Sequence, residues 1–371
     1  MLKVISYSIY HSPNAYLGAV LLDRALQGIP VAIERRPICI PKTRGIKVAD
    51  LVGGRETPAQ SAYHREDCRR WATRYGIEIN LLPPGAFEQR AEHWRRSSYE
   101  REELPARAYY ASVGSGKEAT LDRALFHAAW VSGRDVNEEA VVRDAIASSG
   151  LDPDRLLARA QQEVVGQKLR ESLNAFDRDG CPGVPTWIFD GQRFWGKDRV
   201  DALVLAVKQA LAGGVTIRPV TDSDCEWVSA VVRERWGAPI VVSRGAIHHP
   251  DQLPGFVAVV DDKRVGLLTF HVNDNECEVI TIDALIEGIG IGGALLQQVT
   301  ALARARGCRR IWLITTNENT RALRFYQKQG FVLAAIHRHA LAASRQLKPS
   351  IPRVGRDGIP LRDEIEMERD L

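Results

Sequence analysis

The sequence predicts an α/β domain followed by an α+β domain, and three observations support this fold class. A chain of 371 residues is longer than one hydrophobic core usually serves, which favours two domains. Residues 2–38 read as strand, helix and strand, the start of a βαβ unit. Gly213-Gly214 is the best candidate for a linker, because a new alternation of strands and helices begins directly after it. We therefore expect domains at 1–213 and 214–371.

The first domain is expected to place a long helical stretch, from about 57 to 175, between two groups of strands. Asp190-Gly191 is typical of the tight turn of a hairpin. The expected strands are 2–8, 30–38, Thr186–Asp190 and Arg193–Trp195. The expected helices are one that begins at Ser12-Pro13, then Asp67–Tyr75, Glu118–Val131, Asn137–Ser148 and Asp152–Leu173, and a last one from Asp198 to about Ala212.

The second domain is expected to mix strands and helices around a hairpin that turns at Asp261-Asp262-Lys263. The last strand alternates acidic and apolar residues from Asp363 to Glu368, which predicts an edge strand with its acids outward; attraction of a basic acceptor is the alternative. The expected strands are 216–219, 255–261, 264–272, 276–283 and 309–316, with two more near 331–338 and 359–370. The expected helices begin at Asp222, after Gly290 and at Thr320.

Composition excludes several classes of function. The net charge of +4 is small and forms no basic stripe, so we expect no nucleic-acid partner. No apolar run reaches the roughly 18 residues of a membrane span, and the first strand is too short for a signal peptide. The six cysteines lie far apart with no Cys-x-x-Cys pair, which favours reduced thiols in a cytoplasm. His248-His249 lack a third ligand, so no metal site is expected.

A glycine-rich turn, residues 288–293, lies between a predicted strand and a predicted helix. Gly288, Gly290 and Gly293 also match the dinucleotide pattern G-x-G-x-x-G, but the next strand ends without the acid that would hold a ribose. A phosphate cradle is the better interpretation, because glycines let backbone amides approach an anion and the helix adds its positive end. A turn needed only for packing is the alternative. The cradle comprises Gly288, Ile289, Gly290, Ile291, Gly292 and Gly293.

A second motif follows this turn: Asn319-x-x-Ala322-x-x-Phe325-Tyr326-x-x-x-Gly330-Phe331. The two together resemble the paired motifs of the GNAT acetyltransferases over about 216–338. The resemblance implies a mixed sheet splayed at its fourth and fifth strands, with acetyl-CoA in the cleft. The turn would hold the pyrophosphate, the strand 280–283, including Ile282, would pair with the pantetheine arm, and Asn319 would also reach CoA. The family usually has Arg or Gln where this chain has Glu287, and an acid there opposes a pyrophosphate.

Acetyl transfer to an amine needs a base to remove a proton and an acid to protonate the departing thiolate. Glu276 and Glu278 share one face of their strand, so either is a candidate base, and at least one is expected to be only a solvent-facing carboxylate. The resemblance implies Tyr326 as the acid; packing beside Phe325 is the alternative. The resemblance implies that the acceptor, a small molecule or peptide with an amine, would lie near the end of the first helix of the second domain, at Arg233, Arg235 and Trp236. A solvated helix end is the alternative for these three residues.

Three stretches of the first domain carry a second resemblance, to the DsbA-like thioredoxin fold. They are Ser12-Pro13-Asn14-Ala15-Tyr16-Leu17, Gly183-Val184-Pro185-Thr186 and Phe194-Trp195-Gly196-Lys197-Asp198-Arg199. The last is similar to the branch of 2-hydroxychromene-2-carboxylate isomerases and kappa-class glutathione transferases. The resemblance implies a helical insertion between the two halves of a thioredoxin fold.

The same resemblance implies a site for glutathione or another low-molecular-weight thiol. Ser12 would hydrogen-bond the thiol, Val184-Pro185 would be a cis peptide that pairs with the ligand, and Asp198 would hold an amino group. The helix start would favour a thiolate. Ser12 and Ala15 cannot form a disulfide, which excludes redox exchange at this motif. The family prefers an aromatic residue at Asn14 and a serine at Ala15.

The alternatives for the whole chain differ in class. Ser12-Pro13 is also simply a good helix start, with serine as cap and proline in the first turn. In the charged run Tyr63–Trp71, the indole is expected in the core and the charges in solvent. We therefore weigh an acetyltransferase with a passive binding domain, a bifunctional enzyme with a thiol-dependent isomerase or transferase, and an acetyl-CoA sensor without activity. A homodimer is left open.

Overall fold

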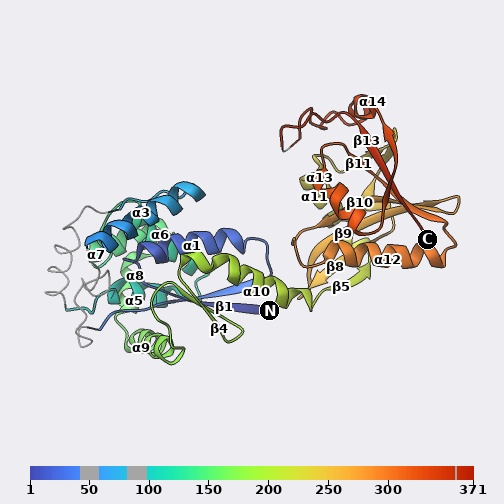
Figure 1. Ribbon diagram of the computed structural model, residues 1–371. Helices are drawn as coiled ribbons and strands as arrows, with labels where there is room; N and C mark the ends of the chain where they lie inside the picture. Colours follow the sequence, from blue (N-terminus) through green and yellow to red (C-terminus); the bar gives the residue numbers. More distant parts are fainter. Residues whose placement is uncertain (42–57, 82–97, 356) are drawn as a thin grey trace. The chain divides into compact units, whose positions relative to one another are not determined.

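The computed structural model describes residues 1–41, 58–81, 98–355 and 357–371. The chain separates into two compact units, Met1–Val207 and Lys208–Leu371 (Figure 1). Each unit has its own sheet and its own cluster of buried apolar side chains. The predicted fold class, an α/β unit followed by an α+β unit, is confirmed.

The first unit contains a four-stranded sheet in the order β2-β1-β3-β4. The pair β1 and β2 is parallel, and the pairs β1–β3 and β3–β4 are antiparallel. Asp190 and Gly191 join β3 to β4 with φ of 47° and 71°, as a tight hairpin turn requires. The strands are β1 (Leu2–Ser8), β2 (Val31–Pro37), β3 (Thr186–Phe189) and β4 (Gln192–Trp195).

Helices cover both faces of this sheet. Tyr7 and Phe176 pack edge to face, which places α9 on one face. Gly18 of α1 approaches Trp187 on the other face, where a Cβ at residue 18 would lie 3.0 Å from the indole ring. The helices of this unit are α1 (Pro13–Ala25), α3 (Pro58–Tyr75), α5 (Glu103–Ser112), α6 (Glu118–Trp130), α7 (Glu139–Ser148), α8 (Pro153–Ala160), α9 (Glu163–Arg178), the short η2 (Lys197–Arg199) and the beginning of α10 (Val200–Ala212).

The prediction of a single helix over Asp152–Leu173 was wrong, because the chain breaks between α8 and α9. Gln162 is extended, with ψ of 142°. Arg107 Nη1 donates to the Ala160 carbonyl at 3.1 Å, which satisfies a carbonyl at the end of α8. Gly166 leaves room for that guanidinium, since a Cβ there would lie 2.7 Å from Arg107 Nη2. Part of the predicted helical stretch, 82–97, lies outside the described residues.

The second unit is built on a seven-stranded mixed sheet in the order β12-β13-β11-β10-β9-β8-β5. All neighbouring pairs are antiparallel except β10 and β11, which are parallel. A separate two-stranded hairpin, β6–β7, was not predicted. The strands are β5 (Thr216–Pro219), β6 (Val241–Ser243), β7 (Ala246–His248), β8 (Gly255–Val260), β9 (Lys263–Asn273), β10 (Glu276–Ala284), β11 (Arg310–Thr316), β12 (Val332–His337) and β13 (Glu364–Asp370).

The sheet is splayed between β10 and β11, the fourth and fifth strands of the main sheet. The two strands pair only from Glu276↔Arg310 to Val279↔Leu313, although both continue for several residues. On its other side, β10 stays paired with β9 through a register shift between Val279 and Thr281, which marks a β-bulge at Ile280. Residues 280–284 therefore have no strand partner on the β11 side, as the predicted cleft requires.

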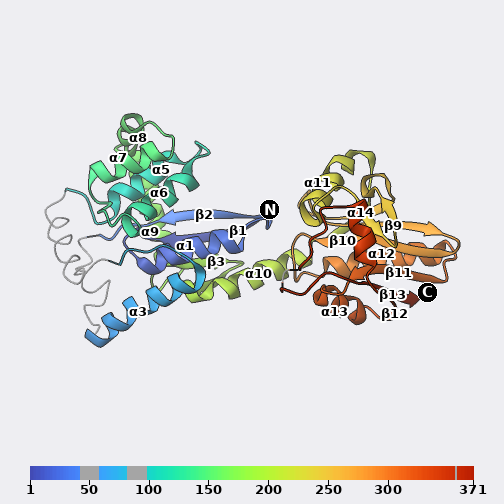
Figure 2. The same cartoon turned by 90° about the horizontal axis from the view of Figure 1, so that it is seen from above.

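Helices α11 and α12 pack on opposite faces of this sheet. Leu267 and Ile280 belong to the buried cluster with Val228 of α11. The neighbouring Gly266 faces α12, since a Cβ there would lie 2.4 Å from the Ile291 side chain. Figure 2 shows α11 and α13 on opposite sides of the sheet. The helices are the short η3 (Asp222–Asp224), α11 (Cys225–Trp236), the short η4 (Pro250–Gln252), α12 (Ile291–Ala305), α13 (Thr320–Lys328) and α14 (Ala340–Leu347).

The prediction that the last strand closes the sheet with its acids outward was wrong on both counts. Strand β13 lies between β12 and β11, so β12 is the edge. Glu364 and Glu366 are buried, because the unpredicted helix α14 and the hairpin β6–β7 supply partners for them. Ser344 Oγ donates to Glu364 at 2.8 Å, and the Arg244 guanidinium lies 3.6 Å from Glu366. Alternation within one strand cannot reveal which of its faces other segments of the chain will cover.

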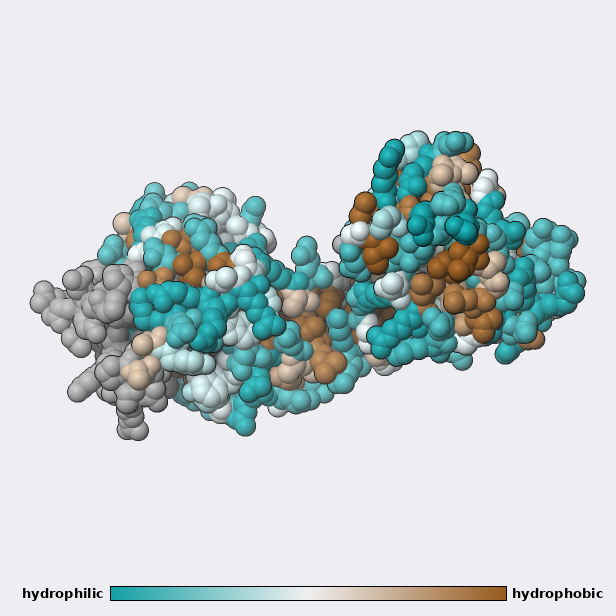
Figure 3. Space-filling view, turned by 45° about the horizontal axis from the view of Figure 1, so that its top comes forward, coloured by the Kyte–Doolittle hydropathy of each residue, from teal (hydrophilic) through white to brown (hydrophobic). Residues whose placement is uncertain are grey.

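Among the described residues, no helix combines the length and the apolar character that crossing a membrane requires. On the face that Figure 3 displays, apolar side chains gather in separate patches surrounded by hydrophilic surface. Three large apolar side chains, Val332, Leu333 and Ile336, are exposed on the edge strand β12.

Candidate functional site

The glycine turn, Gly288–Gly293, joins β10 to the start of α12. Gly288 and Gly290 have φ of 86° and 82°, a conformation that side-chain-bearing residues rarely adopt. The Ala294 amide donates to the Gly290 carbonyl at 3.0 Å. Among the described residues, no backbone carbonyl accepts a hydrogen bond from the amides of Gly288–Gly293. A row of unpaired amides at a helix start fits an anionic group.

Helix α13 packs directly against this turn. Asn319 caps the helix, and its side-chain oxygen accepts from the Ala322 amide at 3.1 Å. Its backbone amide donates to the Thr316 carbonyl at 3.1 Å, whereas its side-chain nitrogen, Nδ2, has no hydrogen-bond partner within the described chain and remains able to donate. A Cβ at Gly292 would lie 3.0 Å from the Phe325 ring, and one at Gly293 would lie 3.7 Å from the Gln329 amide. Gly292 is therefore required for this close approach.

Glu287, which departs from the expected family pattern, is paired with a cation that the sequence analysis did not single out. The Arg321 guanidinium donates to both oxygens of the Glu287 carboxylate, at 2.7 and 2.6 Å. The same hydrogen bonds lower the pKa of the Glu287 carboxyl, which therefore stays ionised at neutral pH. The acid beside the cradle is thus neutralised by Arg321.

Tyr326 lies on α13 with its ring buried between two other rings. The ring centroids of Phe325 and Phe331 lie 5.2 and 5.7 Å from it. Its hydroxyl makes no hydrogen bond to any described residue. Burial, followed by the nearby charge of Asp283, raises the pKa of Tyr326, which keeps the phenol protonated at neutral pH. A buried ring with an unpaired hydroxyl suits a proton donor.

Asp283 stands on the part of β10 that has separated from β11. Its carboxylate accepts a hydrogen bond from the indole Nε1 of Trp236, at the end of α11, at 2.9 Å. Burial raises the pKa of the Asp283 carboxyl. Trp236 was predicted as an acceptor contact, whereas no role was predicted for Asp283.

Glu278 is a buried carboxylate whose contacts are sparse. It accepts a hydrogen bond from Ser243 Oγ of β6 at 2.6 Å, and no described cation lies within ion-pair distance of it. Burial raises the pKa of the Glu278 carboxyl. A carboxylate with a raised pKa and one neutral partner can accept a proton more readily than a paired one.

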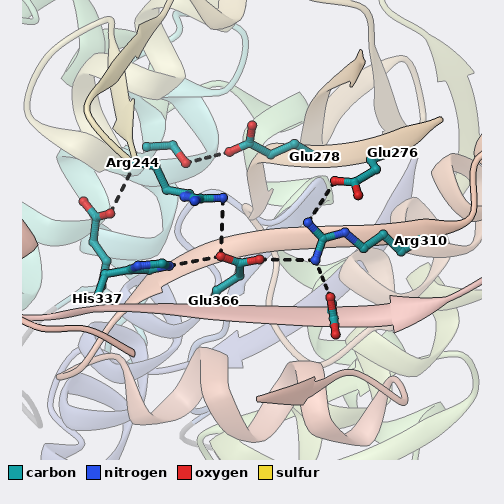
Figure 4. A network of polar contacts seen from close by, with 9 residues as sticks. Arg244, Glu276, Glu278, Arg310, His337 and Glu366 are labelled. Atoms are coloured by element: carbon teal, nitrogen blue, oxygen red, sulfur yellow. Dashed lines mark hydrogen bonds and ion pairs between the residues drawn. The ribbon is translucent and has the colours of Figure 1, made fainter. Parts of the chain in front are cut away.

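Glu276, two residues earlier on the same face of β10, is held in an ion-pair network (Figure 4). Its carboxylate lies 2.9 Å from the Arg310 guanidinium of β11. Arg310 also bonds Glu368 and lies 3.3 Å from Glu366, so one cation serves three acids. Glu366 is further contacted by the His337 imidazole at 3.0 Å. The two candidate bases therefore have different surroundings: Glu276 is ion-paired and Glu278 is not.

The helix start predicted in the first unit is present, with Ser12 as cap of α1. Its Oγ accepts from the Ala15 amide at 3.1 Å, which leaves the hydroxyl hydrogen free to donate elsewhere. Val184-Pro185 is a cis peptide. A Cβ at Gly18 would lie 3.0 Å from Pro185 Cγ, so the cis-proline loop packs against the first turns of α1. Asp198 has a half-exposed side chain beside Arg199, at 3.7 Å.

The segment before Ser12 is fixed by a buried group of charges. The backbone amides of Tyr10 and His11 donate to the Glu102 carboxylate at 2.9 and 3.1 Å. The His11 ring bonds Glu102 through Nδ1 and lies 3.1 Å from Asp135 through Nε2. The two carboxylates raise the pKa of His11 despite its burial. This arrangement gives the start of α1 a rigid support.

A polar cluster from α3 and η2 surrounds Asn14, two residues after Ser12. The buried Lys197 ammonium donates to Asn14 Oδ1 at 2.8 Å and to Asp67 at 2.6 Å. It also lies 5.4 Å from the centroid of the Trp71 ring. The expectation that all charges of the run Tyr63–Trp71 are solvated was wrong for Asp67, because a distant buried lysine pairs with it. The Cys68 thiol donates to Asn14 Oδ1 at 3.6 Å, and burial raises its pKa to about 11.

The residues that the sequence analysis missed share one property: each acts through a partner far along the chain. Ser243 meets Glu278, Arg321 meets Glu287, and Asp283 meets Trp236, over separations of about 35 to 47 residues. No local pattern marks Ser243. A signal for Arg321 did exist, because an acid at an expected phosphate site calls for a compensating cation in the second motif.

Comparisons with known proteins agree with this division into two units. The family model described as the DSBA-like thioredoxin domain matches residues 3–208, and that of the acetyltransferase (GNAT) family matches residues 225–331. Uncharacterized protein YdhI of Bacillus subtilis is 44% identical over 133 residues, 36% of this chain and 83% of that protein.

Two further relatives match nearly their whole length. Uncharacterized protein YxbD of Bacillus subtilis is 38% identical over 158 residues, which is 42% of this chain and 99% of that protein. The 2-hydroxychromene-2-carboxylate isomerase of Sphingobium xenophagum is 28% identical over 204 residues, 55% of this chain and 97% of that protein.

Proposed function

We propose that this chain transfers an acetyl group from acetyl-CoA to an amine. The chain belongs to the DSBA-like thioredoxin domain family, and it also contains a GNAT acetyltransferase domain. One observation carries the proposal: the split between β10 and β11 opens beside a helix start whose amides have no backbone acceptor in the described chain. The acceptor would be a small molecule or a peptide with a primary amine.

The residues present fit a CoA thioester. The backbone amides of Gly288–Gly293 would hold the pyrophosphate, and the side-chain nitrogen of Asn319 would donate to CoA. Residues 280–284, including Ile282, would pair with the pantetheine arm. Acetyl-CoA supplies an acyl group activated as a thioester.

We assign the proton transfers to Glu278 and Tyr326. Glu278 would take the proton from the acceptor ammonium, since burial raises its pKa and no described cation pairs with it. Tyr326 would donate its proton to the departing thiolate, since its raised pKa keeps it protonated. Glu276 would instead hold Arg310 in place. Trp236 and Asp283, on the α11 side of β10, would contact the acceptor.

The direct test is release of free CoA thiol from acetyl-CoA in the presence of a panel of primary amines. Mass spectrometry of the products should find the amine heavier by one acetyl group. A protein that binds acetyl-CoA tightly yet acetylates no amine would instead be an acetyl-CoA sensor.

We propose further that the first unit binds a low-molecular-weight thiol, with glutathione as the first candidate. Support comes from Ser12 and the cis Val184-Pro185 peptide near the first turns of α1. The match to the 2-hydroxychromene-2-carboxylate isomerase covers nearly the whole length of that relative, which favours a bifunctional protein over a passive first unit. Asp198, with its half-exposed carboxylate, would hold the amino group of the ligand.

Ser12→Ala tests this second proposal. The pKa of glutathione bound to the wild-type protein should fall below its free value, because the helix start and the serine hydroxyl both favour thiolate. Ultraviolet titration should show thiolate absorbance at lower pH in wild type, with a smaller shift in the variant. A role of Ser12 in capping alone predicts only a stability loss of about 1 kcal/mol. If no thiol binds, the first unit is not a thiol-dependent enzyme.

A further inference from the structure

Arg321 and Glu287 form an exposed ion pair at the rim of the glycine turn. We propose that Arg321 supplies the phosphate-binding cation that residue 287 lacks, and that Glu287 holds this arginine at the turn until a CoA phosphate takes the carboxylate's place. The inference rests on the proposed acetyl-CoA-dependent function and adds to it the residue that recognises the phosphates.

The packing of α13 places Arg321 on the side of this helix that faces the glycine turn. Phe325 and Gln329 face Gly292 and Gly293, at the start of α12. Residues four apart lie on the same face of a helix, so Arg321 shares the face of Phe325, one turn nearer to Asn319. This face therefore lies along the glycine turn, and Arg321 is the charged side chain at the end of this face nearest Asn319.

The geometry of the pair suits an exchange of anions. Nη1 of Arg321 donates to Oε1 of Glu287 and Nη2 donates to Oε2, and a phosphate presents oxygens to a guanidinium in the same forked manner. The two side chains are 72% and 56% exposed, and exposed pairs contribute little net stability. A phosphate that also reaches the unpaired amides of the glycine turn offers Arg321 a better-connected partner than the lone carboxylate does.

The exchange assigns opposite effects to the two partners. Loss of Arg321 removes a charge-assisted contact to the phosphate and leaves Glu287 as an unpaired acid beside it. Loss of the Glu287 charge removes both the competitor for Arg321 and the repulsion of the phosphate. A purely structural pair would instead make the two substitutions equivalent, because either one breaks the same contact.

Calorimetry with CoA on the full chain tests this inference. Arg321→Gln should weaken CoA binding about tenfold or more, and Glu287→Gln should strengthen it. Pantetheine, which carries no phosphate, should bind both variants as it binds the wild type. Higher salt should reduce CoA affinity less in Arg321→Gln than in the wild type, since one phosphate contact is gone.

Arg324→Gln is the matched control. It removes the same charge from the same helix, on the face shared with Thr320, Leu323 and Gln327 rather than the face of Phe325. Equal CoA affinity for Arg321→Gln and Arg324→Gln would overturn the role of Arg321. Unchanged or weaker binding by Glu287→Gln would overturn the exchange. If the wild type binds pantetheine and CoA equally poorly, the proposed function falls first, and this inference falls with it.

Discussion

Tyr326→Phe should lower turnover in the acetyl-transfer assay by about 10²–10⁴-fold, with little change in affinity for acetyl-CoA. The reason is that the variant removes the proton for the departing thiolate and nothing that binds the ground state. Burial and the nearby charge of Asp283 raise the pKa of Tyr326. In a pH profile of turnover, the fall in rate at high pH that comes from ionisation of Tyr326 should therefore lie above the ordinary tyrosine range. That fall in rate should vanish in the variant.

The stability of Tyr326→Phe separates catalysis from packing. The hydroxyl has no hydrogen-bond partner among the described residues, while the ring packs between Phe325 and Phe331. Removing the hydroxyl alone should therefore leave the melting temperature nearly unchanged. A turnover close to that of the wild type would mean that Tyr326 only packs, and another proton donor would have to be found.

Glu278→Gln should reduce turnover by a similar factor, about 10²–10⁴-fold, since the general base is lost. The pKa of Glu278 is raised, so its carboxylate is protonated as the pH falls through a value above the usual glutamate range. The wild-type rate should fall over that interval, and this acidic limb should be absent from the variant. The measurement is a pH profile of kcat under saturating acetyl-CoA.

Glu276→Gln is the matched control, because it makes the same change on the same face of β10. Its carboxylate is paired with Arg310, so the variant should lose some stability but keep turnover within a few-fold of the wild type. The reverse outcome would transfer the role of base to Glu276. If neither variant changes the rate, an ordered water or ionisation of the substrate itself must remove the proton.

The order of strands and helices was predictable because local patterns determine it. Gly288 and Gly290 mark a turn with positive φ, and Asp190-Gly191 mark a hairpin; in both places the structure follows the residues that the backbone requires. The residue pattern also indicated the long helical stretch between the strands of the first unit, whereas the splayed sheet followed only from the resemblance to the GNAT acetyltransferases.

Predictions failed where distant parts of the chain meet. The break between α8 and α9 depends on Arg107, 53 residues before Ala160, which donates to the Ala160 carbonyl. The burial of Glu364 and Glu366 depends on α14 and β6–β7, which cover a face that an alternating strand would otherwise expose. Long-range contacts of this kind leave no periodic signal in a single sequence.

The residues of the candidate site also fall into those that local motifs predicted and those that only long-range contacts identified. Sequence motifs led to the glycine turn, Asn319 and Tyr326, because each of these belongs to a short contiguous pattern that resembles a family motif. The choice between Glu276 and Glu278 needed the structure, since only contacts from Arg310 and Ser243 distinguish the two carboxylates. The partner of Glu287, Arg321 on helix α13, needed the structure as well.

If the glycine turn binds the phosphates of acetyl-CoA, as we propose, calorimetry should detect the loss of CoA binding in Gly290→Glu. Gly307→Glu is the control: both glycines have positive φ, 82° and 74°, and open space at the position of a Cβ, so the backbone strain is comparable. Only residue 290 would place a side chain and a negative charge in the cradle. We expect Gly290→Glu to stay folded and to lose CoA binding, while Gly307→Glu binds CoA as the wild type does. Unchanged CoA affinity in a folded Gly290→Glu variant would show that the glycine turn does not bind the phosphates of CoA.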